Sequence, residues 1–480
     1  MHQRMRSLRC SPAPSICGAL TKNLSSSPRG ATLIRGGTVC TPDGPQQTDV
    51  LTVDGVITQV EKGLSSTGRT IDAKGKYVLP GAVDIHVHSR DPGFPDKEDF
   101  GTLTAAAAAG GVTVVLDMPN TVPAVDSAGV LEAKAALAHS KARVDFGLWG
   151  LVRSTSTPAQ LEAMAAAGAV GFKAYLAYSF SLSRKQIISS LGDDDPDIEP
   201  PADYGTLARL APAIASLGLP LAIHAEDPAI LAAFRRPLLT YQDLLDSRPP
   251  EAEAVAISAA AAVARDAGVH LHVAHLSSAL GLHAAEDAIQ SGTSLTLETC
   301  PQYLLLSEDD FARVGSAMKV LPPVRTQGDR AALVDGLRRG VIGIVSTDHA
   351  PHTDEEKAQA FEEAPAGSPG VQTLYLSALQ IAAEMGDVWR AAAWVSSTPA
   401  AFAGLDSSKG SIAPGFDADL VIVDPHARTK VSSAAMHSRQ RRGALEGREF
   451  EFEIEEVFLR GEPAGDRPRG RMVRRALVAR

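Results

Sequence analysis

Residues 82–88 read AVDIHVH, a short stretch that ends in two histidines. Val83, Ile85 and Val87 are β-branched, which favours a strand. Because successive side chains in a strand point to opposite faces, His86 and His88 project to the same side, where both imidazoles can bind one metal ion. Taken alone the pair is weak evidence, since two histidines this close often occur by chance.

Seven further apolar runs of this kind follow, and alanine-rich helical stretches separate them. Strands buried on both faces, each followed by a helix, are typical of parallel βα units. Eight such units predict an α/β protein with a closed (β/α)8 TIM barrel over residues 81–409. A doubly wound sheet would need a glycine fingerprint after its first strand, and HVHSRDPG is not one. The eight expected strands are Ala82–His88, Val112–Met118, Val144–Val152, Ala169–Leu176, Pro220–Glu226, Val269–Ser277, Ser294–Cys300 and Val341–His349.

The two ends of the chain have a different sequence pattern from the middle. Short β-type runs alternate with Gly, Pro and Asp turns over residues 31–80 and again over 410–465. We expect the two segments to pair into one small β-sandwich accessory domain. Residues 1–30 contain five basic residues and no Asp or Glu, which is typical of a disordered tail, an upstream start or an organelle-targeting segment. The acidic, proline-rich insert at 184–204 is expected to be a surface loop, with a lid over the barrel mouth as the alternative.

Composition narrows the class of protein. The net charge of −10 gives no basic field for nucleic acid, and no apolar run is long enough to cross a membrane. Of the four cysteines only Cys300 lies in the main body, so no disulfide framework or cysteine zinc site is expected there. These features predict a soluble, cytoplasmic enzyme, and any metal must be held by histidine, carboxylate or a rarer ligand.

Ligand-type side chains stand at the ends of five of the predicted strands. Barrel enzymes carry their chemistry at these C-terminal strand ends. Each residue alone has an ordinary explanation: a snorkelling Lys173, a core His275, a helix-capping Asp348. Their joint placement predicts a metal site instead. His270 and His272 have the opposite strand alternation to His275, so we do not include them among the predicted ligands. The predicted set is His86, His88, Lys173, His224, His275 and Asp348.

Several short motifs, in the same order along the chain, resemble those of the cyclic amidohydrolases, a family that includes dihydroorotase, allantoinase and dihydropyrimidinase. They include LPGAVDIHVHSRDPG, GFKAYLAYSF, LAIHAED, HVAHLSS, ETCPQYLLLS and STDHAPHTDEEK. The resemblance implies two Zn²⁺ ions per chain, the first bound by His86, His88 and Asp348 and the second by His224 and His275. Lys173, carboxylated by CO2, would bridge both ions. Asp348 would then be the catalytic acid and base, moving a proton from a metal-activated hydroxide to the leaving amide nitrogen.

Residues near this set bear on the substrate, a small cyclic amide. Arg90, Asn120 and His352 match positions that hold the substrate carboxylate in dihydroorotases, and allantoinases typically lack this arginine. Without the motifs, Arg90 would be a surface ion pair with Asp91 or Asp96. Ser179 and Phe180 match a substrate-capping Thr-Phe pair of the dihydroorotases found in multifunctional proteins. The leading prediction is dihydroorotase, which interconverts L-dihydroorotate and N-carbamoyl-L-aspartate.

Three departures from the family pattern put that substrate in question: Leu321 in place of a polar residue, Gln302 and Ser89. The alternative is an allantoinase, hydantoinase or dihydropyrimidinase with the same chemistry on another ring. A non-catalytic scaffold is disfavoured because all six ligand positions are filled. A homodimer or homotetramer, common in the family, is expected, and no nucleic-acid or membrane partner is.

Overall fold

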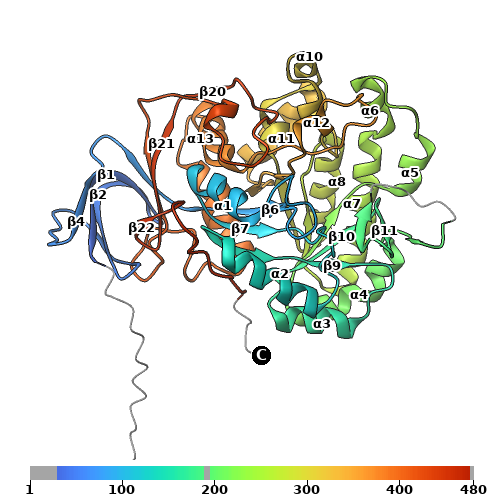
Figure 1. Cartoon of the computed structure of the whole chain (residues 1–480), viewed down its shortest axis with the longest axis horizontal. Coiled ribbons are helices and arrows are strands. Elements are labelled where there is room, and N and C mark those ends of the chain that lie inside the picture. Colours follow the sequence, from blue (N-terminus) through green and yellow to red (C-terminus); the bar gives the residue numbers. More distant parts are fainter. Residues whose placement is uncertain (1–29, 189–194, 476–480) are drawn as a thin grey trace, which may run out of the picture.

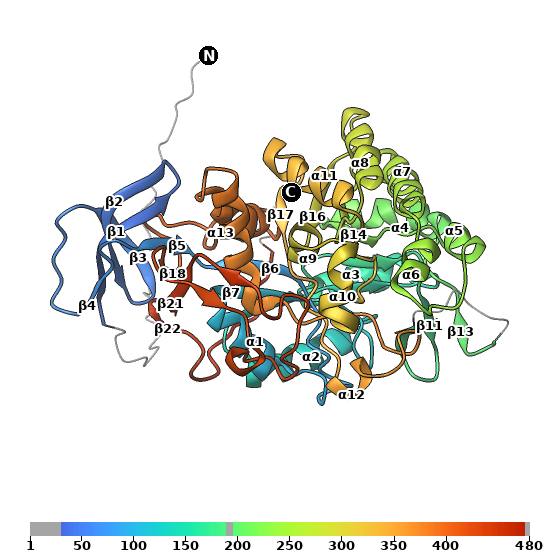
Figure 2. The same cartoon turned by 90° about the horizontal axis from the view of Figure 1, so that it is seen from above.

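A computed structural model describes residues 30–188 and 195–475. The prediction of a tail at 1–30 therefore lies, except for Gly30, outside the described residues. Within the described ranges no helix combines the length and apolarity needed to cross a membrane. A small β domain lies at one side of the molecule and the barrel with its helices makes up the rest (Figures 1 and 2).

The barrel contains a strand in each of the eight predicted runs. In chain order the strands are β6 (Ala82–Val87), β7 (Val112–Asp117), β8 (Asp145–Leu148) with β9 (Gly150–Val152), β10 (Phe172–Tyr175), β14 (Leu221–His224), β15 (Leu271–Val273), β16 (Leu295–Thr299) and β17 (Ile344–Val345). Neighbours pair in parallel, as in β10 with β14 and β14 with β15. The amide of His88 donates to the carbonyl of His349 at 2.7 Å and closes the last strand onto the first. The (β/α)8 fold is confirmed.

Alanine-rich helices cover the outside of the barrel (Figure 2). Local signals set their ends: Asp99 caps α1 through the amide of Thr102, and Gly168 ends α3 with a φ of 107°. The helices are α1 (Phe100–Ala109), α2 (Ala128–Lys141), α3 (Pro158–Ala167), α4 (Tyr204–Leu217), α5 (Pro228–Ala233), α6 (Tyr241–Ser247), α7 (Pro250–Ala267), α8 (Ala279–Gln290), α9 (Pro301–Leu305), α10 (Phe311–Val314), α11 (Gln327–Arg339), α12 (Asp354–Lys357), α13 (Leu374–Glu384), α14 (Arg390–Ala392) and α15 (Thr398–Phe402).

Strands from both ends of the chain share the sheet of the β domain. Its order is β22-β21-β18-β5-β1-β2-β3, with β4 beside β1. The N-terminal strands are β1 (Thr32–Thr41), β2 (Gly44–Val53), β3 (Val56–Glu61), β4 (Arg69–Asp72) and β5 (Tyr77–Pro80), and the C-terminal ones are β18 (Leu420–Asp424), β21 (Glu453–Leu459) and β22 (Glu462–Pro463). Two more short strands, β19 (Thr429–Lys430) and β20 (Glu449–Phe450), pair with each other. In both views the C-terminal strands lie beside the N-terminal ones (Figures 1 and 2). The predicted β-sandwich domain built from both termini is therefore confirmed.

A buried ion cluster joins this domain to the barrel. The Lys409 ammonium lies 2.7 Å from Asp145, at the start of β8, and 2.7 Å from Asp419, just before β18. Arg460, which follows β21, contacts the same Asp145 carboxylate at 2.5 Å. Burial disfavours the charged form of Lys409, but the carboxylates of Asp419, Asp145 and Asp417 raise its pKa above the usual value. The cluster is thus a buried ionic link between the two parts of the fold.

The insert after β10 is more ordered than a plain surface loop. β12 (Gln186–Ile188) and β13 (Ile198–Glu199) pair antiparallel with β11 (Ser179–Ser181) in a small three-stranded sheet. Residues 189–194 lie outside the described part of the chain. The lid role therefore stays a prediction.

Candidate metal centre and substrate cavity

The C-terminal ends of the barrel strands open into a cavity of about 520 Å³. This is the end at which barrel enzymes place their active sites. Eight of the predicted site residues line it: His86, His88, Arg90, Asn120, His224, His275, Asp348 and His352. Lys173 lies in β10 with no exposed surface and is not among the lining residues.

His86, His88 and Asp348 form a compact group of possible metal ligands. One donor atom from each lies within 4.8 Å of the others. The Asp348 carboxylate is 3.0 Å from Nε2 of His88 and 3.4 Å from Nε2 of His86. Asp348 has a φ of 49°, which is uncommon for a residue with a side chain and often marks a functional position. A nitrogen–nitrogen–oxygen group of this kind suits a divalent transition metal.

Neighbouring side chains fix the orientation of both imidazoles. Nδ1 of His86 lies 2.5 Å from the carboxylate of Glu298, and Nδ1 of His88 donates to the amide oxygen of Asn120 at 2.6 Å. A carboxylate or carbonyl on one ring nitrogen selects the tautomer that leaves the other nitrogen free to bind a metal. Both Nε2 atoms face the Asp348 carboxylate. Burial lowers the pKa of His88, which keeps this ring neutral.

His224 and His275 form a second pair beside the first group. Nδ1 of His224 lies 3.0 Å from Nε2 of His275, and the rings of His275 and His86 are 5.3 Å apart between centroids. Nε2 of His224 lies 2.7 Å from Glu226, whose carboxylate also accepts from Arg248. The two histidine sets are adjacent; Glu226 holds His224, whereas Nδ1 of His275 is buried without a hydrogen-bond partner among the described residues.

Lys173 is the buried cation nearest to both sets. Its Nζ is inaccessible and has no hydrogen-bond partner among the described residues. Burial lowers the pKa of Lys173 to about 8, so a neutral amine is within reach at physiological pH. An unpartnered amine and the five neighbouring donors fit a two-metal centre in which a modified lysine supplies oxygen ligands. The chemistry of the donor set is therefore compatible with bound metal.

Two basic side chains, Arg90 and His352, lie together in the cavity lining. Nη2 of Arg90 lies 3.1 Å from Nε2 of His352, and its Nε donates to the carbonyl of Pro351 at 3.3 Å. Among the described residues no carboxylate lies within ion-pair distance of Arg90. Asp91 pairs with Lys141 at 2.7 Å instead, so the expected alternative of an Arg90–Asp91 surface pair is not formed. Burial and the nearby Arg90 charge lower the pKa of His352 well below its usual value.

Two of the predicted substrate contacts do not line the cavity. Ser179 and Phe180 are buried in β11. The Phe180 ring packs with Ala124 and Leu151, and the Arg153 guanidinium lies 4.0 Å from its centroid. The β11 strand pairs with β12 and β13, and neither Ser179 nor Phe180 is among the residues that line the cavity. Direct contact with substrate therefore stays a prediction that this structure does not support.

The three departures from the family pattern differ in their position. Ser89 donates to Asp117 at 2.8 Å, and Gln302 donates to the carbonyl of Thr347 at 3.4 Å; neither side chain lines the cavity. Leu321 does line it. Only Leu321 therefore bears directly on what the cavity accepts.

Sequence reasoning missed several residues of the site. Glu298 and Glu226 hold the imidazoles, and Arg248, Tyr178 and Lys319 line the cavity. Two of them carried a signal, because Glu298 stands near the end of the seventh barrel strand and Glu226 follows His224 by two residues. A buried acid at the end of a barrel strand is a candidate functional residue. His272, excluded by its alternation, lies outside the cavity but 3.4 Å from Glu298.

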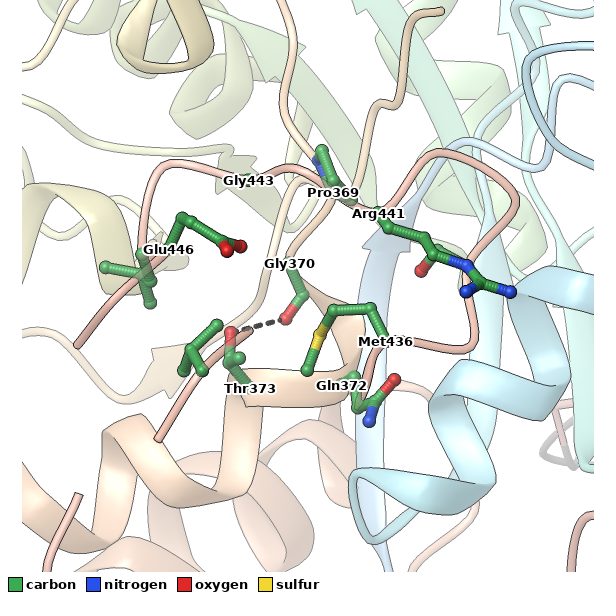
Figure 3. A pocket seen from close by; sticks show the side chains of 11 residues that line it. Pro369, Gly370, Gln372, Thr373, Met436, Arg441, Gly443 and Glu446 are labelled. Carbon is green, nitrogen blue, oxygen red and sulfur yellow. Dashed lines mark hydrogen bonds between the residues drawn. The ribbon is translucent and has the colours of Figure 1, made fainter. Parts of the chain in front are cut away.

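A second hollow lies at the edge of the barrel, under residues 369–373 and 431–446 (Figure 3). Met436, Thr373 and Glu446 are among its lining residues, and the Thr373 hydroxyl donates to the carbonyl of Gly370 at 2.9 Å. Its volume of about 20 Å³ admits little more than one water molecule. The strand-end cavity is therefore the better candidate for a substrate site.

Comparison with known proteins agrees with this geometry. The model of the amidohydrolase family matches residues 77–464. The chain belongs to the amidohydrolase family. Allantoinase of Bacillus velezensis is 35% identical over 439 residues, which cover 89% of this chain and 92% of that protein. Dihydroorotase of Halobacterium salinarum is 37% identical over 371 residues, which cover 77% and 82%. The structure of L-hydantoinase from Arthrobacter aurescens matches with a TM-score of 0.84 at 27% identity, covering 93% of this chain and 100% of that one.

Proposed function

We propose that this amidohydrolase is a two-zinc dihydroorotase, which hydrolyses the cyclic amide of L-dihydroorotate to N-carbamoyl-L-aspartate and catalyses the reverse ring closure. The observation that carries the proposal is Arg90. Its guanidinium lines the cavity and has no acidic partner within ion-pair distance among the described residues. A cation held in this way favours a ligand that brings its own carboxylate.

The metal ligands would be those predicted from the sequence. His86, His88 and Asp348 would hold one zinc ion, His224 and His275 the other, and Lys173, carboxylated by CO2, would contribute to both. When bound, the two ions supply an activated water as nucleophile and polarise the ring carbonyl. Lys173 is suited to its role because burial lowers its pKa to about 8, and only the neutral amine reacts with CO2.

Asp348 is the residue that moves the proton. Burial opposes its charged form, but His86 and His88 hold the pKa of Asp348 below its usual value, so the carboxylate is ionised at neutral pH. One carboxylate oxygen can accept a proton from the attacking water and deliver it to the ring nitrogen as the amide bond breaks. Ring closure runs through the same proton transfer in reverse.

Arg90 and His352 would orient the ring through its carboxylate. The guanidinium offers parallel N–H donors that match a carboxylate in a bidentate geometry. Nε2 of His352 is 3.1 Å from Arg90, which places both side chains at one end of the cavity. Asn120 acts on His88 in this structure and could also reach the substrate, since it lines the same cavity.

An allantoinase is the second candidate. Leu321 favours it because an apolar side chain lines the cavity where a polar residue is usual in the family. Relatives named allantoinase, such as the one from Bacillus velezensis, cover most of this chain. In that case Arg90 would bind no substrate carboxylate.

The deciding experiment is turnover of dihydroorotate, allantoin and hydantoin by zinc-loaded protein, with bound metal quantified in the same sample. The proposal predicts about two zinc ions per chain and the highest kcat/KM on dihydroorotate. Preference for allantoin would establish the second candidate. Protein that retains less than about one zinc ion per chain and turns over no ring would point to the non-catalytic scaffold.

A further inference from the structure

One wall of the cavity is a segment without regular secondary structure. Residues 361–367 read FEEAPAG, and Glu362 through Gly367 all line the cavity. We call these seven residues the wall segment. Gly367 has a φ of 135°, and a Cβ there would lie 2.3 Å from the carbonyl oxygen of Ala350. The segment is therefore packed closely against the strand end that carries Asp348 and His352.

Two lysines hold the wall segment by its main chain. The ammonium of Lys319 donates to the carbonyls of Phe361 and Glu362, the latter at 3.2 Å. The ammonium of Lys357 donates to the carbonyls of Pro365 and Gly367, both at 2.9 Å. A further bond at 3.4 Å from Lys357 to the carbonyl of Lys319 ties the two lysines together.

Neither lysine has a charged partner for its ammonium. No carboxylate lies within ion-pair distance of Lys319 or Lys357 in the parts of the chain that the structure describes, and Glu356 pairs with Lys97 instead. Lys319 is only 4% exposed. Burial and the nearby charges of Lys319 and Arg90 lower the pKa of Lys357 to about 7, although the Glu356 carboxylate opposes this shift. Carbonyl oxygens satisfy the hydrogen bonds of a buried cation but do not neutralise its charge.

We propose that Lys319 and Lys357 are positioning residues that clamp the wall segment and make this end of the cavity selective for substrates with an anionic substituent. Arg90 and Lys319 line the cavity, and Lys357 contacts the wall segment from outside the lining; none of these three basic side chains forms an ion pair among the described residues. An anion there relieves the repulsion between them, whereas a neutral ring does not. The selectivity part of this inference rests on the proposed function.

The clamp is tested without any substrate by hydrogen exchange. Lys319→Met and Lys357→Met each keep most of the side-chain length but remove the donors. Amides of the wall segment should exchange at least about tenfold faster in both variants, because losing about 1.4 kcal/mol of local stability has that effect. Barrel strand β7 should be unchanged. Lys430→Met, at an exposed lysine of the β domain, is the matched control. Unchanged exchange in the wall segment would overturn the clamp.

Selectivity is tested with two rings that differ only in the carboxylate, L-dihydroorotate and 5,6-dihydrouracil. Each lysine variant should raise KM for dihydroorotate about tenfold and raise KM for dihydrouracil much less, with bound zinc near the wild-type content. An equal loss on both rings would show that the lysines act on the fold alone, and would overturn the selectivity. If wild-type protein turns over neither ring, the proposed function fails and the exchange measurement alone decides the clamp.

Discussion

Each imidazole at the His86 group and at His224 has one nitrogen turned toward a possible metal and the other held by a neighbouring side chain. Glu298, Asn120 and Glu226 supply these contacts, at 2.5, 2.6 and 2.7 Å. Such partners fix the tautomer and the ring angle and raise the basicity of the ligand. The orientation of the candidate metal ligands therefore depends on side chains that do not themselves face the metal position.

Glu226→Gln tests this dependence. The change keeps the shape but removes the carboxylate that holds Nε2 of His224, so zinc affinity should fall about 10- to 100-fold. Competition with a chromophoric chelator measures it. The control is Glu61→Gln at an exposed position of β3, which should bind zinc like the wild type. Unaltered affinity in the Glu226 variant would show that the contact does not orient the ligand.

Arg90→Ala tests the carboxylate contact. Losing a charged hydrogen bond of about 1.5–3 kcal/mol should lower kcat/KM for dihydroorotate about 10- to 150-fold. Activity on dihydrouracil should change little, because that ring has no carboxylate for Arg90 to bind. Steady-state kinetics on both rings give the result. Similar losses on the two substrates would refute the assignment.

Most of the candidate metal ligands in the cavity could be predicted because they stand at the ends of strands. His86, His88, His224, His275 and Asp348 occupy the C-terminal ends of predicted strands, and the barrel brings them together. Lys319 and Arg248 lie in connecting segments, where no periodicity tells which side chain turns inward. Ser179 and Phe180 were placed by analogy, and the structure buries them in β11, outside the cavity lining.

At the scale of elements, the strands were easier to predict than the segments between them. Each predicted barrel run contains strand structure, because apolar β-branched runs buried on both faces leave few alternatives. The third run is split at Trp149 into β8 and β9. The insert at 184–204, which contains β12 and β13, was expected to be a loop, since its acidic, proline-rich residues have no strand alternation.

Gly367→Ala tests the wall segment as an element. A Cβ at this position would meet the Ala350 carbonyl oxygen at 2.3 Å and Cδ2 of His352 at 3.0 Å. We expect a loss of stability of about 1–3 kcal/mol and a raised KM for dihydroorotate, because His352 must shift. Urea unfolding and kinetics measure the two effects.

The matched control is Gly129→Ala in helix α2, where nothing lies within 4 Å of the new Cβ. That change should stabilise the protein by about 0.4–1 kcal/mol. A Gly367 variant that is as stable and as active as the Gly129 variant would contradict the close packing of the wall segment.

At the scale of the whole molecule, the Lys409 cluster links the β domain to the barrel. Its ammonium lies 2.7 Å from Asp145, 2.9 Å from Asp417 and 2.7 Å from Asp419. Lys409→Met should destabilise the protein by about 3–5 kcal/mol, because it leaves buried carboxylates without their partner. Lys430→Met removes only an exposed pair and should change stability by less than about 1 kcal/mol. Urea unfolding that gave the two variants equal stability would show that the cluster does not hold the two parts together.

The central claim is that a two-metal amidase cavity with a cationic end acts on a ring that bears a carboxylate. The most direct test is the ratio of kcat/KM for L-dihydroorotate to that for 5,6-dihydrouracil, measured on the zinc-loaded wild-type protein. The account predicts a ratio of at least about 10, and up to about 150, in favour of dihydroorotate. A ratio near one, or a preference for the neutral ring, would contradict it.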